Sequence, residues 1–236
     1  MRLRDQCILG IEGTGHSVSV GLMTHGVPRG EIFNNSDSPS SQTLMVSVDQ
    51  LLRQCQVKKE DLRGICVTLG PGSFTSMRIC LSVAESMGLG LNIPIYGIDE
   101  LILIAESVPF YPHSIKVIKN AYKGELYTAT YDTSSGYAKL VDALNLITPD
   151  QFFRQLQAND LVLGNGIEKL RSEGFDILKK QAKSNSSYSR TVSGINVIEY
   201  FLDSGVKKPS DIPLEPLYIR LSEAELNYNK QFGKPG

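Results

Sequence analysis

Apolar residues recur along this chain in two patterns, short continuous runs and longer stretches with helical spacing. The runs from Cys7 to Ile11 and from Gly64 to Leu69 are rich in β-branched residues, which is typical of strands covered on both faces. From Leu44 to Cys55 the apolar residues recur every three or four positions, which predicts an amphipathic helix. The chain therefore alternates buried strands with helices, as α/β proteins do.

The predicted elements fall into two similar halves. The first half has strands at 7–11, 17–23 and 31–34, a helix at 41–55, a strand at 64–69, a helix at 75–91 and a strand at 95–98. A helix at 99–106 follows, and then strands at 114–119, 125–131 and 137–146, a helix at 149–157, a strand at 161–163 and a further helix at 195–202. Residues 171–190 are polar and show no clear pattern.

A duplicated βββαβα order resembles the architecture of actin, hexokinase and the sugar kinases, in which ATP lies between two subdomains. We therefore predict an α/β fold of this actin/hexokinase-like (ASKHA) class. The predicted subdomains are 1–105 and 106–213, with a C-terminal helix at 214–232 that joins the first. Because the two halves share no repeated sequence, the duplication is a structural prediction only.

The first strand and the Gly70-Pro71-Gly72 turn are the candidate ligand site. Glycines there allow unusual dihedral angles, and Ser73 and Thr75 are good N-caps, so free backbone N–H groups are expected beyond the strand end. Two interpretations of the turn stay open, an anion cradle and an ordinary strand–helix connection. The turn matches neither the P-loop nor the dinucleotide-binding motif. The candidate cofactor-binding residues are Glu12, Gly13, Thr14, Gly70, Gly72 and Ser73.

Composition narrows the function further. The net charge of -1 gives no reason to expect a general nucleic-acid binder, although Lys179, Lys180, Lys183 and Arg190 leave a local RNA-facing surface as the alternative to a solvated loop. The three histidines and four cysteines form no metal-binding or redox motif, and no nucleophile elbow exists. We predict no catalytic residues and no metal site.

With no signal peptide or transmembrane run in the sequence, we expect a reduced, cytoplasmic setting.

The helix after the turn carries a stripe of small residues, Ser76, Cys80, Ala84 and Gly88, spaced every four positions. Such a stripe lets another helix approach closely. Two interpretations stay open: internal packing on the sheet or on the 41–55 helix, and an intermolecular helix bundle. If the stripe forms an intermolecular helix bundle, the predicted partner interface consists of Leu44, Val48, Leu52, Ser76, Met77, Cys80, Leu81, Ala84 and Gly88.

The segment from Gly70 to Ile79 (GPGSFTSMRI), followed by Asn92 to Ile98, resembles the signature of the TsaB (YeaZ) family. Residues Gly124 to Tyr127 and Pro216 to Arg220 agree with it, and the resemblance spans nearly the whole chain. It implies the actin-like fold and a non-catalytic partner of a TsaD-type enzyme in the threonylcarbamoyl modification of tRNA adenosine next to the anticodon. It also implies a TsaE-type ATPase partner, a homodimer when alone, only indirect contact with tRNA and no membrane.

The chain departs from this family at polar positions that face the cleft. Glu12-Gly13-Thr14 stands where Asp-Thr-Ser is usual, Asn120-Ala121-Tyr122 replaces Asp-Ala-Arg, and Ser76 replaces a glycine. No cofactor is therefore expected, with ATP or ADP a candidate only within the complex. Two alternatives to the scaffold remain. One is an ATP-dependent kinase or ATPase that uses Glu12, and the other is a metallopeptidase.

Overall fold

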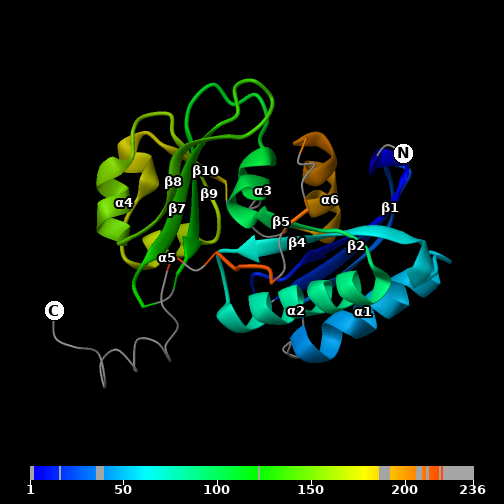
Figure 1. The fold of residues 1–236 in the computed structure, drawn as a ribbon. Helices are drawn as coiled ribbons and strands as arrows, with labels where there is room; N and C mark the ends of the chain where they lie inside the picture. The colour runs from blue at the N-terminus through cyan, green and yellow to red at the C-terminus, as the bar shows by residue number, and fades with distance from the viewer. Residues whose placement is uncertain are drawn as a thin grey trace, which may run out of the picture.

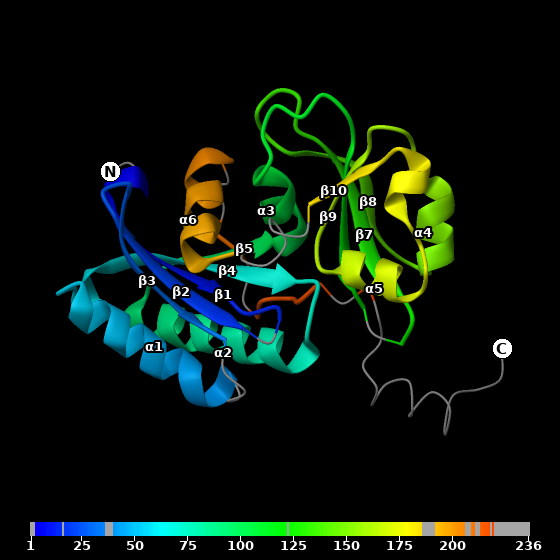
Figure 2. The same cartoon turned by 180° about the vertical axis from the view of Figure 1, so that it is seen from behind.

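The computed structural model describes residues 3–15, 17–35, 40–121, 123–185, 192–205, 209–210, 213–217 and 219. Within these residues the chain forms two five-stranded sheets with helices packed around them (Figure 1). The view from behind shows α3 standing between the two sheets (Figure 2). The α/β class and the two-subdomain arrangement are therefore confirmed.

The element bounds follow the predicted pattern closely. The strands are β1 (Cys7–Glu12), β2 (Val18–Thr24), β3 (Val27–Asn34), β4 (Leu62–Gly70), β5 (Ile95–Asp99), β6 (Ile115–Asn120), β7 (Leu126–Asp132), β8 (Lys139–Ile147), β9 (Leu161–Leu163) and β10 (Lys183–Asn185). The α-helices are α1 (Ser40–Gln54), α2 (Phe74–Leu91), α3 (Glu100–Glu106), α4 (Pro149–Gln155), α5 (Gly166–Ser172) and α6 (Gly194–Asp203).

The two sheets share one topology, which confirms the duplication. The first sheet has the order β3-β2-β1-β4-β5, and the second, read from the edge formed by β8, has the order β8-β7-β6-β9-β10. When the strands of each half are numbered from one to five along the chain, both sheets have the order third, second, first, fourth, fifth. In both, the first three strands pair antiparallel as two hairpins. The fourth strand then pairs parallel with the first. Neither half depends on sequence repetition, because the pattern of buried positions alone specifies it.

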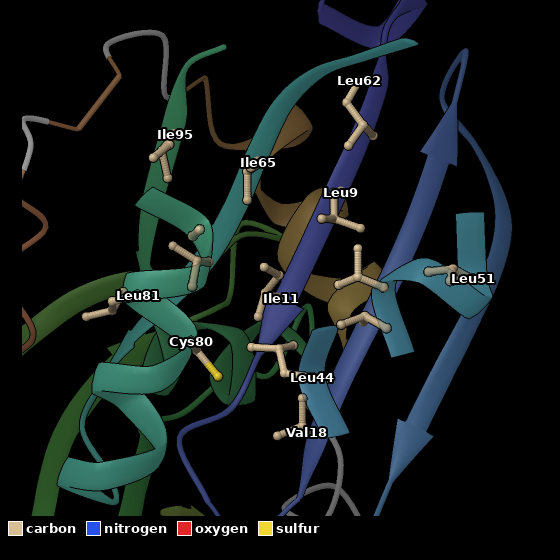
Figure 3. Close-up of a cluster of buried hydrophobic side chains, with 14 of the residues drawn as sticks. Leu9, Ile11, Val18, Leu44, Leu51, Leu62, Ile65, Cys80, Leu81 and Ile95 are labelled. Atoms are coloured by element: carbon tan, nitrogen blue, oxygen red, sulfur yellow. The ribbon is translucent and has the colours of Figure 1, made fainter. Parts of the chain in front are cut away.

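Helices cover both faces of the first sheet. α1 and α2 bury their apolar sides against Leu9, Ile11 and Val20 on one face. Figure 3 shows Leu44 from α1 and Cys80 from α2 directed toward the same strands. On the other face, Val197, Ile198 and Phe201 of α6 pack against Ile8 and Met23.

α6 comes very close to the first sheet. A side chain built on Gly10 would meet the Gly194 carbonyl oxygen at 2.0 Å. The helix thus lies in the range predicted for the second subdomain, 106–213, yet packs on the sheet of the first. The chain returns to the first subdomain before residue 213.

The second sheet has its own two cores. Leu101, Ile104 and Ala105 of α3 pack on its inner face, and Phe152 and Ile167 belong to the core beneath α4 and α5. α4 begins as predicted, with Thr148 as N-cap and Pro149 in its first turn.

Three parts of the secondary-structure prediction need correction. α5 was not predicted, because the Gly164-Asn165-Gly166 turn before it masks a helix that buries only Ile167 and Leu170. The polar stretch 171–190 contains a 3-10 helix, Ile177–Lys180, and the short strand β10. The predicted helix 214–232 is not helical over 214–217, where Leu214 is buried and the Leu217 N–H donates to the Leu69 carbonyl at 2.9 Å. Residues 220–232 lie outside the described part of the chain.

Candidate functional site

The candidate cofactor-binding residues do come together, at the ends of β1 and β4. The Ser73 N–H donates to the Thr14 carbonyl at 2.7 Å, so the loop after β1 lies directly on the turn after β4. A side chain on Gly72 would meet that same carbonyl oxygen at 1.9 Å, and one on Gly13 would meet Cys80 Sγ at 2.2 Å. Close packing therefore explains both glycines, because Gly72 lies against the loop after β1 and Gly13 lies against Cys80 of α2.

Three backbone amides of these loops, those of Gly13, Thr14 and Ser73, already have acceptors inside the chain. The Thr14 N–H donates to Glu12 Oε1 at 2.8 Å, and the Gly13 N–H lies 3.4 Å from Thr68 Oγ1. The Ser73 N–H is taken by Thr14, as described above, and the Ser73 hydroxyl accepts from the Ser76 N–H as N-cap of α2. Of the two interpretations of the turn, the contacts favour the ordinary strand–helix connection over an anion cradle.

Two residues that the sequence did not single out complete the site, Glu100 and Lys119. Lys119 lies in β6 of the second sheet, yet its ammonium donates to the Pro71 carbonyl at 2.9 Å and to Thr14 Oγ1 at 3.0 Å. It also forms an ion pair with the carboxylate of Glu100, the first residue of α3. The side chains of Lys119 and Glu100 are 6% and 9% exposed, so this ion pair joins the two subdomains away from water.

Glu12 and Glu100 are the two acids of this cluster. Thr14 Oγ1 lies 2.8 Å from Glu12 Oε1 and is also hydrogen-bonded to Glu100. The pKa of Glu12 is raised to about 7, chiefly by burial and next by the negative charge of Glu100, while the bonds from Thr14 and the charge of Lys119 oppose the rise. When Glu12 takes up a proton, the cluster has one negative charge fewer beside the Lys119–Glu100 ion pair.

The pocket at this cluster is small, about 140 Å³, and is bordered by Ser17, Asn35 and Asn165 as well as by the cluster itself. Sites for drug-sized ligands usually have about 300–1,000 Å³. A nucleotide phosphate and its Mg²⁺, which the fold class implies here, would need the space and the oxygen atoms that Lys119 now takes. The residues present do not fit that group.

The residues predicted as a partner interface are mostly in the chain's own core, which corrects that prediction. Leu44, Val48, Leu52, Met77, Cys80, Leu81, Ala84 and Gly88 are buried, and Ser76 is half-buried. A side chain on Gly88 would meet Ile95 Cδ1 at 2.6 Å, so the small stripe lets α2 lie close to β5. The stripe packs internally, which is the first of the two interpretations above.

The same two helices nevertheless expose a different, uncharged surface. Met45 of α1 and Ser82, Val83, Ser86 and Met87 of α2 line a shallow depression of about 400 Å³, which we call the α1–α2 groove. Met45 is 47% exposed, and two further apolar residues of these helices, Val46 of α1 and Leu89 of α2, are 63% and 66% exposed. Over its whole length α2 carries only two charged residues, Arg78 and Glu85, and the Glu85 carboxylate accepts from the Leu214 N–H.

The remaining predictions concern a metal site, a membrane span and the basic stretch. Among the described residues, no three His, Cys, Asp or Glu side chains gather closely enough to hold a metal ion. No described helix has the length and apolar character needed to cross a membrane. In the basic stretch, Lys180 and Lys183 lie over the rings of Phe153 and Tyr111, while Arg190 lies outside the described residues.

Known proteins that resemble this chain identify its family. The family described as "TsaD: tRNA N6-adenosine threonylcarbamoyltransferase" matches residues 34–210. The chain belongs to this family and, within it, to the TsaB/YeaZ proteins. The TsaB of Bacillus subtilis, a tRNA threonylcarbamoyladenosine biosynthesis protein, is 24% identical over 94% of this chain and 97% of its own length. The TsaB of Escherichia coli is 27% identical over 52% of this chain and 54% of its own.

Solved structures agree on the fold. A Pseudomonas aeruginosa protein described as similar to peptidase YeaZ covers 91% of this chain and 100% of its own, with a TM-score of 0.74 at 18% identity. YeaZ from the same organism covers 82% of this chain and 89% of its own, with a TM-score of 0.68 at 18% identity. The TsaB/YeaZ resemblance noted from the GPGSFT segment is thereby confirmed, and with it the actin-like fold.

Proposed function

We propose that this chain takes part in the threonylcarbamoyl modification of tRNA adenosine as a non-catalytic scaffold that binds and activates a TsaD-type enzyme. Its relatives are named as threonylcarbamoyladenosine biosynthesis proteins, which supports the pathway. The carrying observation is the α1–α2 groove, an uncharged apolar depression between two long helices. Exposed apolar surface of this kind loses water favourably when a partner covers it.

The catalytic alternatives draw less support from the residues. A kinase or ATPase needs an acid free to organise Mg²⁺, and both Glu12 and Glu100 are engaged with Thr14 and Lys119. A peptidase of the metal-dependent type needs a ligand set for which the described residues offer no candidate. We therefore propose an accessory subunit, without a resident nucleotide or metal.

We propose partners for the same surface. A TsaD-type protein is the proposed occupant of the groove in a heterodimer, and a second copy of this chain is the proposed occupant when the protein is alone. A TsaE-type ATPase would join the heterodimer, and tRNA would be contacted only through the complex.

The test is a binding measurement with the cognate TsaD-type protein. Size-exclusion chromatography with light scattering is expected to give a 1:1 heterodimer that Ser82→Arg weakens, because a long cation is introduced into an uncharged groove. Glu60→Arg, an exposed site in the turn before β4, serves as the matched control. A heterodimer equally stable with Ser82→Arg would contradict the assignment of the groove, and saturable binding of Mg-ATP that Glu12→Gln removes would favour the ATPase instead.

A further inference from the structure

The ammonium of Lys119 lies at the centre of the cleft between the subdomains, with an acceptor for each of its three protons. These acceptors are the Pro71 carbonyl, Thr14 Oγ1 and the Glu100 carboxylate. We propose that Lys119 is a built-in cation that takes the place of a cationic ligand beside Glu100 and Thr14 and locks the subdomains in one orientation.

The oxygen atoms around Lys119 would otherwise suit a hard divalent cation. The Glu100 carboxylate, the Thr14 hydroxyl and the Pro71 carbonyl contact the ammonium, and the Glu12 carboxylate is linked to them through Thr14. Oxygen atoms of these types are the ligands that Mg²⁺, Ca²⁺ and Mn²⁺ accept. A buried pair of acids without a cation is costly, so one must be provided by a ligand, a proton or a side chain. In this chain Lys119 provides the cation for Glu100, and the raised pKa of Glu12 favours the neutral form of the second acid.

The lock follows from the elements that the contacts join. Lys119 extends from β6, whereas Thr14 follows β1 and Pro71 follows β4 on the other sheet. Any opening that moves the first sheet away from the second would break the contacts of the ammonium with Thr14 and Pro71 and leave two of its protons without acceptors in a buried place. The backbone bond from Ser73 to Thr14 keeps the two acceptor loops together, so the contacts act as one unit.

The position of Lys119 in its strand supports a specific role. Side chains alternate along β6, and Ile115, Val117 and Lys119 are all buried, the first two in the core formed with α3. A lysine at such an inward position needs an anionic partner, which Glu100 supplies at the start of α3. Lys116, on the opposite side of the strand, instead faces Asp160 of its own subdomain at 3.9 Å.

The two lysines of β6 give a matched experiment. Lys119→Met, Lys116→Met and the wild-type chain are titrated with Mn²⁺ by calorimetry, using the full chain without a partner. Lys119→Met is expected to bind Mn²⁺ at one site at least about tenfold more tightly than the other two, and Glu100→Gln added to it should abolish that site. Saturable binding to the wild type, or no gain with Lys119→Met, would overturn the proposal.

A measurement on the wild type covers the case in which Lys119→Met does not fold. The ¹⁵N-labelled ammonium of Lys119, assigned through its side-chain carbons, is expected to give a separate NMR signal with slow proton exchange that MgCl₂ leaves unchanged. Exchange as fast as that of the exposed lysines would overturn the lock, and a saturable response to MgCl₂ would overturn the replacement of a ligand. Neither result bears on the α1–α2 groove, so the lock and the proposed partner stand or fall separately.

Discussion

The cleft lies between the two subdomains and the α1–α2 groove lies on the first, and the two differ in whether their side chains already have partners within the chain. The cleft is polar and buried, and Glu12, Thr14, Glu100 and Lys119 satisfy one another there. The groove is apolar and open to water, with Met45 47% exposed. A ligand entering the cleft must replace good internal contacts, whereas a partner covering the groove only removes water from apolar groups. We therefore propose that this chain binds through the helix surface and not through the cleft.

The largest expected effect separates the buried and exposed sides of α2. Ala84→Arg places a long cation in a fully buried position, and we expect a loss of about 4 kcal/mol or more in the free energy of unfolding. Ser82→Arg, two residues earlier on the exposed side, should change that quantity by no more than about 0.5 kcal/mol. Urea unfolding followed by circular dichroism measures both. Similar losses for the two variants would contradict the division of the helix.

A smaller effect is expected at the centre of the cleft. Lys119→Met leaves two carboxylates without their cation, and we expect a loss of about 3 kcal/mol near neutral pH. The loss should shrink in acid, because the pKa of Glu12 is already raised to about 7 and protonation removes one charge. Lys116→Met should cost less than Lys119→Met, because the Lys116 ammonium is 3.9 Å from Asp160 and the Asp160 carboxylate keeps the hydrogen bond from the Gln157 N–H. Urea titrations at several pH values decide; equal losses for the two variants would show that Lys119 is an ordinary lysine.

The next smaller effect is the pH dependence of the free energy of unfolding that Glu12 causes. Glu12 has a folded-state pKa of about 7 against an ordinary value of 4.5, so the folded chain holds a proton that the unfolded chain has released. The stability that this proton provides is present below pH 4.5 and is lost as the pH rises through about 7. Glu12→Gln stays neutral, so between about pH 5 and pH 8 it should gain about 1–3 kcal/mol relative to the wild type.

Chemical unfolding of both proteins across that range measures this gain. Asp99, whose pKa burial raises to about 6, is present in both and cancels in the comparison. Parallel pH profiles for the wild type and Glu12→Gln would mean that Glu12 is ionised in the folded chain.

The sequence predicted the fold well, because burial patterns specify it. Continuous apolar runs located β1 and β4, and helical spacing from Leu44 to Cys55 located α1. α5 was missed, because a seven-residue helix after a glycine turn has too few periods to recognise. Local patterns could not assign α6 to a sheet, since its packing on Gly10 is a contact between distant parts of the chain.

The candidate site was only partly predictable. Glu12 and Thr14 were found from the turn beside them, but Glu100 and Lys119 were not, because their pairing joins residues that no local motif connects. One signal was available: strand alternation puts Lys119 on the inward side with Ile115 and Val117. The small stripe on α2 was located correctly, but spacing alone cannot distinguish a sheet of the same chain from a helix of another.

We propose that binding of the TsaD-type partner depends on the α1–α2 groove and not on the cleft. The most direct measurement is the Kd of the cognate TsaD-type protein for the wild type, Ser82→Arg and Glu12→Gln, determined by calorimetry on folded proteins. The account predicts that Ser82→Arg weakens binding by about 100-fold or more and that Glu12→Gln changes it by less than about threefold. Unchanged binding by Ser82→Arg together with a large loss for Glu12→Gln would contradict it.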